Sequence, residues 1–225
     1  MKSNLNKEEQ QSLYSAKKIA VISALGSTMK VNSIGGTIFD NSQYDVDISH
    51  IKTDTFLENS LVAKLKKALP GVAIDNYPQL QSRPTIGGDD LFTTVNQKLY
   101  EKLLSELKKA NYDYVFLIRA SDDSNNKFLT QPFGLSESQA REEVHVYQNA
   151  NLTIIKLADK SIMKYTPLYS GWDGSNRSEL LEKGITVADK KSLQPEFIKK
   201  SVTKIMALIK KGLDDYLNKL FSAKK

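Results

Sequence analysis

The alternation of apolar and polar residues divides the chain into short strands and longer helices. Residues 17–25 are almost continuously apolar, as in a buried strand. Between residues 28 and 49 apolar positions alternate with polar ones, and two turn signals interrupt them, Gly35-Gly36 and Asp40-Asn41. This pattern predicts a strand followed by a hairpin.

Three segments carry apolar residues at helical spacing. The first spans about 54–69, where Thr55 and Glu58 fit a capping box that would satisfy two amides at the helix start. The second spans about 89–110. The last spans about 195–221, a length of roughly 40 Å at the helical rise per residue.

The second half of the chain contains further strands. Residues 114–118 are apolar on both faces, which predicts a central strand covered on both sides. Residues 120–141 read as a long polar loop, and 170–191 as a second loop region with a short helix at 178–183. Between these loops the pattern predicts a three-stranded antiparallel meander, with strands at 144–147, 152–157 and 162–165.

This order of elements predicts an α/β fold. We expect a mixed sheet with an antiparallel meander at one edge, helices packed against it and a long amphipathic C-terminal helix. Residues 17–225 form a single domain in this interpretation. Residues 1–16 form a polar, frayed or weakly helical lead-in.

Composition excludes several kinds of chemistry. The 225 residues include no cysteine, so disulfides, thiolate metal sites and cysteine nucleophiles are excluded. The only histidines, His50 and His145, are far apart in sequence, and we predict no metal site and no cofactor. Only four of the 32 basic residues are arginine, which argues against a nucleic-acid partner.

The net charge of +6 resides in the C-terminal segment. Residues 189–225 hold ten lysines against four acidic residues. The lysines of the last helix lie opposite its apolar stripe. Two interpretations stay open: the stripe packs on the sheet, or the helix contacts a lipid surface or an acidic partner.

No apolar run reaches the length of a membrane span, and the first sixteen residues lack the apolar core of a signal peptide. The expected location is the bacterial periplasm or envelope if an export signal was removed, and otherwise the cytoplasm.

Four loop residues are the candidate ligand-binding residues. Asp122 and Asp123 follow the central strand, at the edge where α/β sheets place ligands, and paired carboxylates can hold a cation or share a proton. Trp172 and Asp173 lie in a turn-rich segment, where an aromatic side chain serves as a recognition anchor or as a cap on the core. A solvated loop is the alternative for the aspartates. The catalytic residues are unknown, because neither a Gly-x-Ser-x-Gly elbow nor a phosphate-binding glycine loop is present.

Two stretches resemble known bacterial families. Residues 18–25 with the following Gly-Ser-Thr, the segment Thr37-Ile38-Phe39-Asp40-Asn41 and then Val46-Asp47-Ile48 resemble a group of uncharacterised bacterial proteins, many of them predicted lipoproteins. In that group an Asp is usual at the position of Ser27 and a Gly at that of Asp40. The hairpin around Ala158-Asp159-Lys160 is similar to envelope domains such as the amino-terminal domain of TolB and the curli-secretion lipoprotein, without their glycine. The resemblance implies an envelope accessory or assembly role.

The leading hypothesis is therefore a soluble, non-enzymatic binding or accessory domain of the bacterial envelope, with a protein partner. Membrane contact is expected only peripherally or through a missing lipid anchor, and the oligomeric state is open. One alternative is a hydrolase or metal-dependent enzyme that uses the acidic loop residues. Another is an interaction protein whose basic C-terminal helix contacts an acidic partner or lipid.

Overall fold

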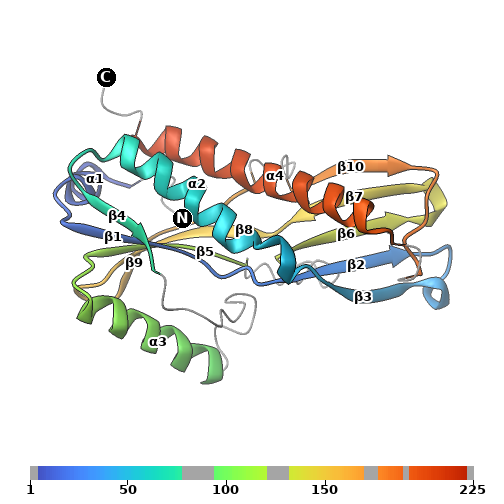
Figure 1. Cartoon of the computed structure of the whole chain (residues 1–225), viewed down its shortest axis with the longest axis horizontal. Helices are drawn as coiled ribbons and strands as arrows, with labels where there is room; N and C mark the ends of the chain where they lie inside the picture. The colour runs from blue at the N-terminus through green and yellow to red at the C-terminus, as the bar shows by residue number, and fades with distance from the viewer. Residues whose placement is uncertain (1–4, 78–93, 121–131, 170–176, 190–192, 222–225) are drawn as a thin grey trace.

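The computed structural model describes residues 5–77, 94–120, 132–169, 177–189 and 193–221. Its strands form two five-stranded mixed sheets that lie end to end (Figure 1). The first, sheet A, has the order β4 (Ala73–Asn76), β1 (Lys18–Ser23), β5 (Tyr114–Ala120), β8 (Ala150–Lys156) and β9 (Ser161–Pro167). The second, sheet B, has the order β3 (Ser42–Asp47), β2 (Thr28–Ile34), β6 (Phe133–Ser138), β7 (Glu143–Gln148) and β10 (Ser178–Lys183).

Four stretches of the chain run from one sheet into the other, and each supplies one strand to each sheet. We call these stretches paths. The chain passes from β1 to β2, from β5 to β6, from β7 to β8 and from β9 to β10, and the four paths keep the same order in both sheets. Sheet A gains β4, which pairs with β1 in parallel, and sheet B gains β3, which pairs with β2 in a hairpin. The two sheets are therefore built on the same four paths in the same order.

Helices cover both faces of sheet A. Helix α2 (Thr53–Ala68) packs on β1 and β4, and α3 (Thr94–Lys109) buries Leu103, Leu104 and Leu107 on the opposite face. Helix α4 (Pro195–Phe221) lies beside α2 and continues over β6, β7 and β10 of sheet B. Helix α1 (Lys7–Tyr14) buries Leu13 in the same core as α2 and α4.

The α/β class and the long C-terminal helix are confirmed. The apolar stripe of α4 is buried, which decides in favour of packing onto the sheet. The strands, however, divide between two sheets. Consecutive strands β7 and β8 do not pair with each other as a meander would, because the chain changes sheets at Asn149.

The structure contains two strands where the sequence predicted other elements. Strand β6 lies in the segment expected to be a loop, because the buried Glu137 interrupts its apolar alternation. Strand β10 replaces the expected short helix at 178–183. It is an edge strand rich in charge, and its Glu179 and Glu182 pair with Lys204 and Lys200 of α4 at 2.9 and 2.7 Å.

The predicted capping box of α2 was also wrong. The N-cap is Lys52, in the left-handed conformation with φ 53°, and its side chain makes no capping bond. Thr55 lies inside the helix. Glu58 is 1% exposed and accepts a hydrogen bond from the backbone of β1.

Gly212 allows α4 to approach the connection between β9 and β10 closely. A Cβ at this position would lie 1.8 Å from the carbonyl oxygen of Leu168, which is backbone and cannot rotate away. Leu168 itself is fixed, because its amide donates to the carbonyl of Ala150 at 2.9 Å.

We predict that Gly212→Ala lowers the free energy of unfolding by about 1–3 kcal/mol through overpacking. In an unhindered helix the same change would stabilise by about 1 kcal/mol. Urea unfolding measures the difference. Gly36→Ala is the matched control, since a Cβ there meets nothing within 4 Å. A stabilised Gly212→Ala variant would contradict the close contact.

Candidate functional site

The carboxyl end of β1 is where strand order places a ligand crevice. Strand β1 lies between β4 and β5, and helices α2 and α3 lie on opposite faces, so the connections diverge between β1 and β5. Open α/β sheets bind ligands at such a point. Here the chain itself continues through it into β2, and the amide of Ala24 donates to the carbonyl of Ile118 at 2.8 Å.

The segment by which the chain leaves β1 for β2 is called the crossing here. Two carboxylates of α2 hold it in place. Asp54 Oδ1 accepts from Ser23 Oγ at 2.5 Å and from the Leu25 amide at 3.0 Å, and its Oδ2 accepts from the Gly26 amide at 3.1 Å. Glu58 Oε1 accepts from the Ser23 amide at 2.8 Å. These carboxylates replace the ladder partners that the strand loses between the sheets, so their role is structural.

We predict that Asp54→Ala lowers the free energy of unfolding by about 1–3 kcal/mol, because donors of the crossing lose their acceptor. Asp54→Asn retains one oxygen acceptor and should lose less. Chemical denaturation of both variants and of Asp215→Ala, which removes a carboxylate from α4, tests this. Equal stability of Asp54→Ala and Asp215→Ala would show that the crossing does not depend on Asp54.

The four candidate residues from sequence lie outside the described residues. Asp122 and Asp123 belong to 121–131, between β5 and β6, and Trp172 and Asp173 belong to 170–176, between β9 and β10. Both segments connect sheet A to sheet B in sequence. That these residues bind a ligand stays a prediction.

A buried arginine near the end of β5 escaped the sequence analysis. Arg119 is 4% exposed, its guanidinium lies 4.8 Å from the ring centre of Tyr165, and its Nε donates to Thr153 Oγ1 at 3.1 Å. Asn151 donates to the hydroxyl of the same tyrosine. This polar cluster faces the α3 side of sheet A, three residues before Asp122. In the sequence, the one sign of this arginine's role was its charge within an otherwise apolar strand.

The histidines do not form a metal centre with other described residues. His50 is exposed, and His145 lies 3.3 Å from Glu143 on the face of sheet B opposite α4. Hydrogen bonds from Lys183 and then His145 lower the pKa of the Glu143 carboxyl. Within the described ranges no three His, Asp or Glu side chains are grouped to hold a metal.

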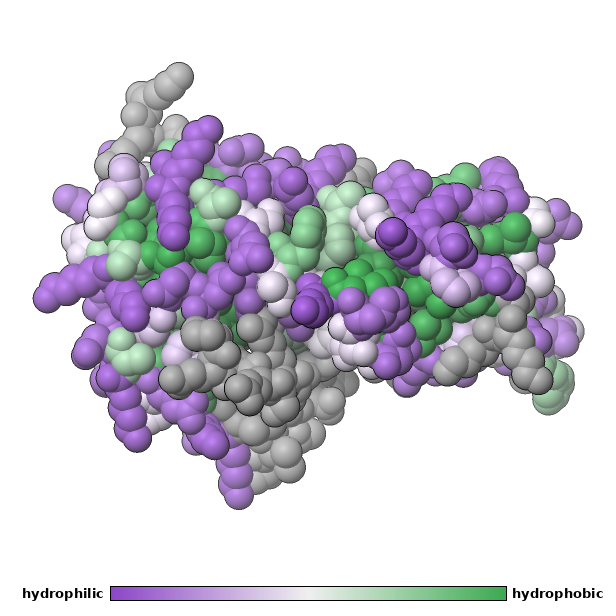
Figure 2. Space-filling model, in the orientation of Figure 1, coloured by the Kyte–Doolittle hydropathy of each residue, from purple (hydrophilic) through white to green (hydrophobic). Residues whose placement is uncertain are grey.

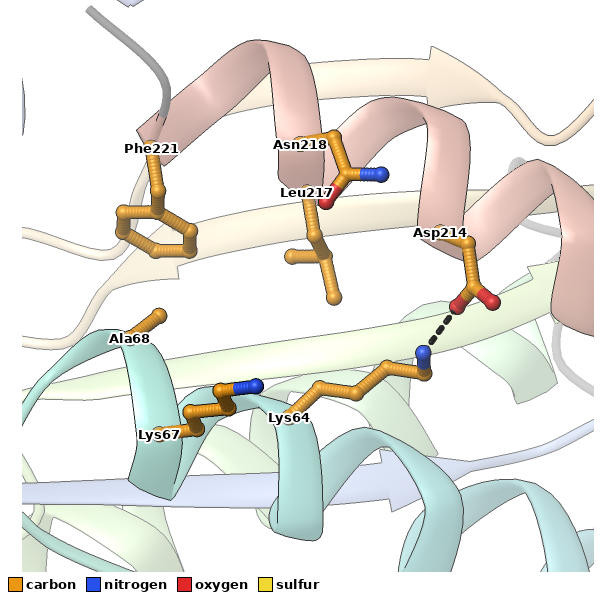
Figure 3. A pocket seen from close by; sticks show the side chains of 7 residues that line it. All are labelled: Lys64, Lys67, Ala68, Asp214, Leu217, Asn218 and Phe221. Atoms are coloured by element: carbon orange, nitrogen blue, oxygen red, sulfur yellow. Dashed lines mark ion pairs between the residues drawn. The ribbon is translucent and has the colours of Figure 1, made fainter.

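An open groove lies between the carboxyl-terminal turns of α2 and α4 (Figure 3). We call it the α2–α4 groove; it has a volume of about 540 Å³ and is lined by Lys64, Lys67, Ala68, Asp214, Leu217, Asn218 and Phe221. The two helices run side by side and end at the same end of the molecule (Figure 1). The space exists because the small Ala68 faces Leu217 and Phe221 across it (Figure 3).

The groove combines an apolar floor with a charged rim. Leu217 and Phe221 form the floor, and Tyr14 of α1 supports Phe221 in an edge contact with ring centres 6.1 Å apart. Lys64 pairs with Asp214 across the groove (Figure 3). Figure 2 shows hydrophobic residues between polar ones where α2 and α4 end. Apolar side chains beside a few charged and polar ones are typical of a binding surface.

Sequence reasoning missed this groove because it depends on which helices pair. Lys64 and Lys67 are three residues apart, and Asp214 and Asn218 four apart, so each pair lies on one helix face. Nothing in either helix alone indicates that the two faces meet.

A second pocket of about 550 Å³ lies near the amino ends of β1 and β5, at the end of these strands away from the crossing into β2. Lys17, Lys108 and Lys156 contribute to it. Lys108 Nζ donates to the carbonyl of Ala158 at 2.9 Å, and Asp113 accepts from the backbone amides of Lys17 and Lys18 at 2.7 and 3.1 Å. These groups tie the turns around the strand ends together.

The lysines of α4 are partly used within the fold. Lys200 and Lys204 pair with β10, whereas Lys210, Lys211 and Lys219 are exposed. No helix in the described part of the chain is long and apolar enough to cross a membrane.

No protein-family model matches the chain, and no curated protein matches it. Among solved structures, it is similar to a neuraminyllactose-binding hemagglutinin homolog from Helicobacter pylori, with 12% identity, a TM-score of 0.36, and coverage of 90% of this chain and 84% of that one. It is also similar to a PelC dodecamer from Paraburkholderia phytofirmans, with 10% identity, a TM-score of 0.30, and coverage of 86% and 87%. A point variant of the PelC dodecamer gives 9% identity and a TM-score of 0.31, with coverage of 86% and 88%. At these scores the likenesses carry no argument about function.

Proposed function

We propose that this chain is a non-enzymatic binding or accessory domain that contacts a protein partner in the bacterial envelope. The observation that carries the proposal is the contrast between two places in the fold. At the carboxyl end of β1 the chain's own crossing is bonded to Asp54, whereas the α2–α4 groove is open and has an apolar floor.

The chemistry of these two places supports binding over catalysis. Asp54 and Glu58 accept hydrogen bonds from backbone amides, which gives both carboxylates a structural role. The groove offers an apolar floor and two lysines, which suit an apolar side chain accompanied by negative charge. The envelope location rests on the sequence resemblance of residues 18–48 and of the β8–β9 hairpin.

We predict no turnover in a panel of hydrolase substrates, and no rise in melting temperature with Mg²⁺, Ca²⁺, Mn²⁺ or Zn²⁺. A metal-dependent enzyme would be stabilised, because a ligand that binds only the folded state shifts the unfolding equilibrium. The variants to compare are Asp122→Ala and Asp173→Ala, with Asp159→Ala in the exposed β8–β9 turn as control. Activity lost only in the first two would overturn the proposal in favour of the enzyme.

We predict that the protein in its source cells has a processed N-terminus and is found in the envelope fraction. Cell fractionation followed by mass spectrometry of the native N-terminus measures both properties. A chain that begins at Met1 and remains in the cytosol would remove the envelope location from the proposal.

A further inference from the structure

The tip of the β2–β3 hairpin presents an exposed apolar anchor. Phe39 is 90% exposed and Ile34, at the end of β2, is 43% exposed. Large aromatic side chains dominate the energy of protein interfaces when they enter a pocket.

The tip is built to hold this anchor in place. The side chain of Asp40 accepts from the amide and hydroxyl of Thr37 at 3.2 and 2.7 Å, which closes the short 3₁₀ helix that contains Phe39. Asn41 Oδ1 accepts from the Gly35 amide at 2.9 Å. A Cβ on Gly35 would lie 2.2 Å from the Cβ of Asp40, so the two sides of the loop touch. A loop fixed in this way loses little entropy when it binds.

The tip and the α2–α4 groove have opposite charge. Between residues 34 and 42 the tip has one charged side chain, Asp40. The groove carries Lys64 and Lys67 on its rim, and its single acid, Asp214, is already paired with Lys64. Opposite charges around an apolar contact favour one orientation of docking.

The two features lie at opposite ends of the elongated molecule (Figure 1). The tip of one copy cannot reach its own groove. We propose that the β2–β3 tip of one copy docks into the α2–α4 groove of a second copy, with Phe39 against Leu217 and Phe221. This inference rests on the proposed binding function and names the partner as another copy of the chain.

Such a contact is heterologous, since it joins two different surfaces. Each added copy leaves a free tip at one end and a free groove at the other, so the assembly grows as a filament or closes as a ring. Two antiparallel copies, each with its tip in the groove of the other, would form the smallest closed assembly.

Sedimentation velocity over a concentration series tests the proposal. The wild-type chain should associate. Phe39→Ser should weaken association roughly thirtyfold or more, the factor that corresponds to about 2 kcal/mol for an interface anchor. Lys67→Glu should weaken it severalfold, and more at low salt than at high salt.

Each variant has a matched control. Phe56→Ser removes another exposed phenylalanine, which is 49% exposed and lies in the first turn of α2. Lys66→Glu makes the same charge reversal at the neighbouring residue, which is exposed and does not line the groove. Both controls should associate like the wild type.

Mixing Phe39→Ser with a double variant that blocks the groove, Lys67→Glu with Ala68→Glu, separates this contact from other modes of association. A Phe39→Ser copy keeps its groove and a Lys67→Glu, Ala68→Glu copy keeps its tip, so the mixture should form a one-to-one heterodimer that cannot grow. The inference is overturned by a wild type that stays monomeric, by Phe39→Ser copies that associate normally, or by a mixture that forms no heterodimer. It is equally overturned if Phe39→Ser affects only binding to liposomes. None of these results bears on catalysis, which the substrate panel measures separately.

Discussion

The fold depends on how the backbone amides and carbonyls find hydrogen-bond partners where the four paths pass between sheet A and sheet B. Strands that part at this level lose their ladder partners, and buried amides and carbonyls left unpaired would destabilise the structure. Asp54 and Glu58 supply acceptors at the first path. At the third path Gln148 accepts from the Ala150 amide at 2.9 Å and donates to the Leu168 carbonyl at 3.0 Å. Polar side chains therefore make the sheet break possible.

Helix α4 is the element that keeps the two sheets in one body. Its buried face contacts α2 above sheet A and β6, β7 and β10 in sheet B, so either sheet can move only by breaking part of one helix–sheet interface. Ion pairs from Lys200 and Lys204 fix it to the edge strand β10. The groove at the end of α4 and the tip beyond β2 are consequently held at a constant separation, which is the condition for a repeating contact between copies.

The sequence predicts those parts of the fold whose signal is local. The apolar run at 114–118, the periodic stripe of α4 and the α/β class follow from side-chain spacing alone. Strands β6 and β10 were missed because Glu137 and the charged edge residues obscure the alternation. The groove and the role of Glu58 depend on contacts distant in sequence, such as Ser23 with Glu58. Ligand binding remains a prediction for Asp122, Asp123, Trp172 and Asp173.

A single residue, Asn149, separates β7 from β8. The side chains of Val144 and Val146 in β7 and of Ala150, Leu152 and Ile154 in β8 all enter the same core, so the alternation passes through the sheet break without a change of phase. Insertion or deletion of one residue here would exchange the two faces of either β7 or β8, so the apolar side chains of that strand would leave this core while those of the other strand stayed in it. The connection between β7 and β8 therefore does not tolerate a change in length of one residue, whichever amino acid is inserted or removed.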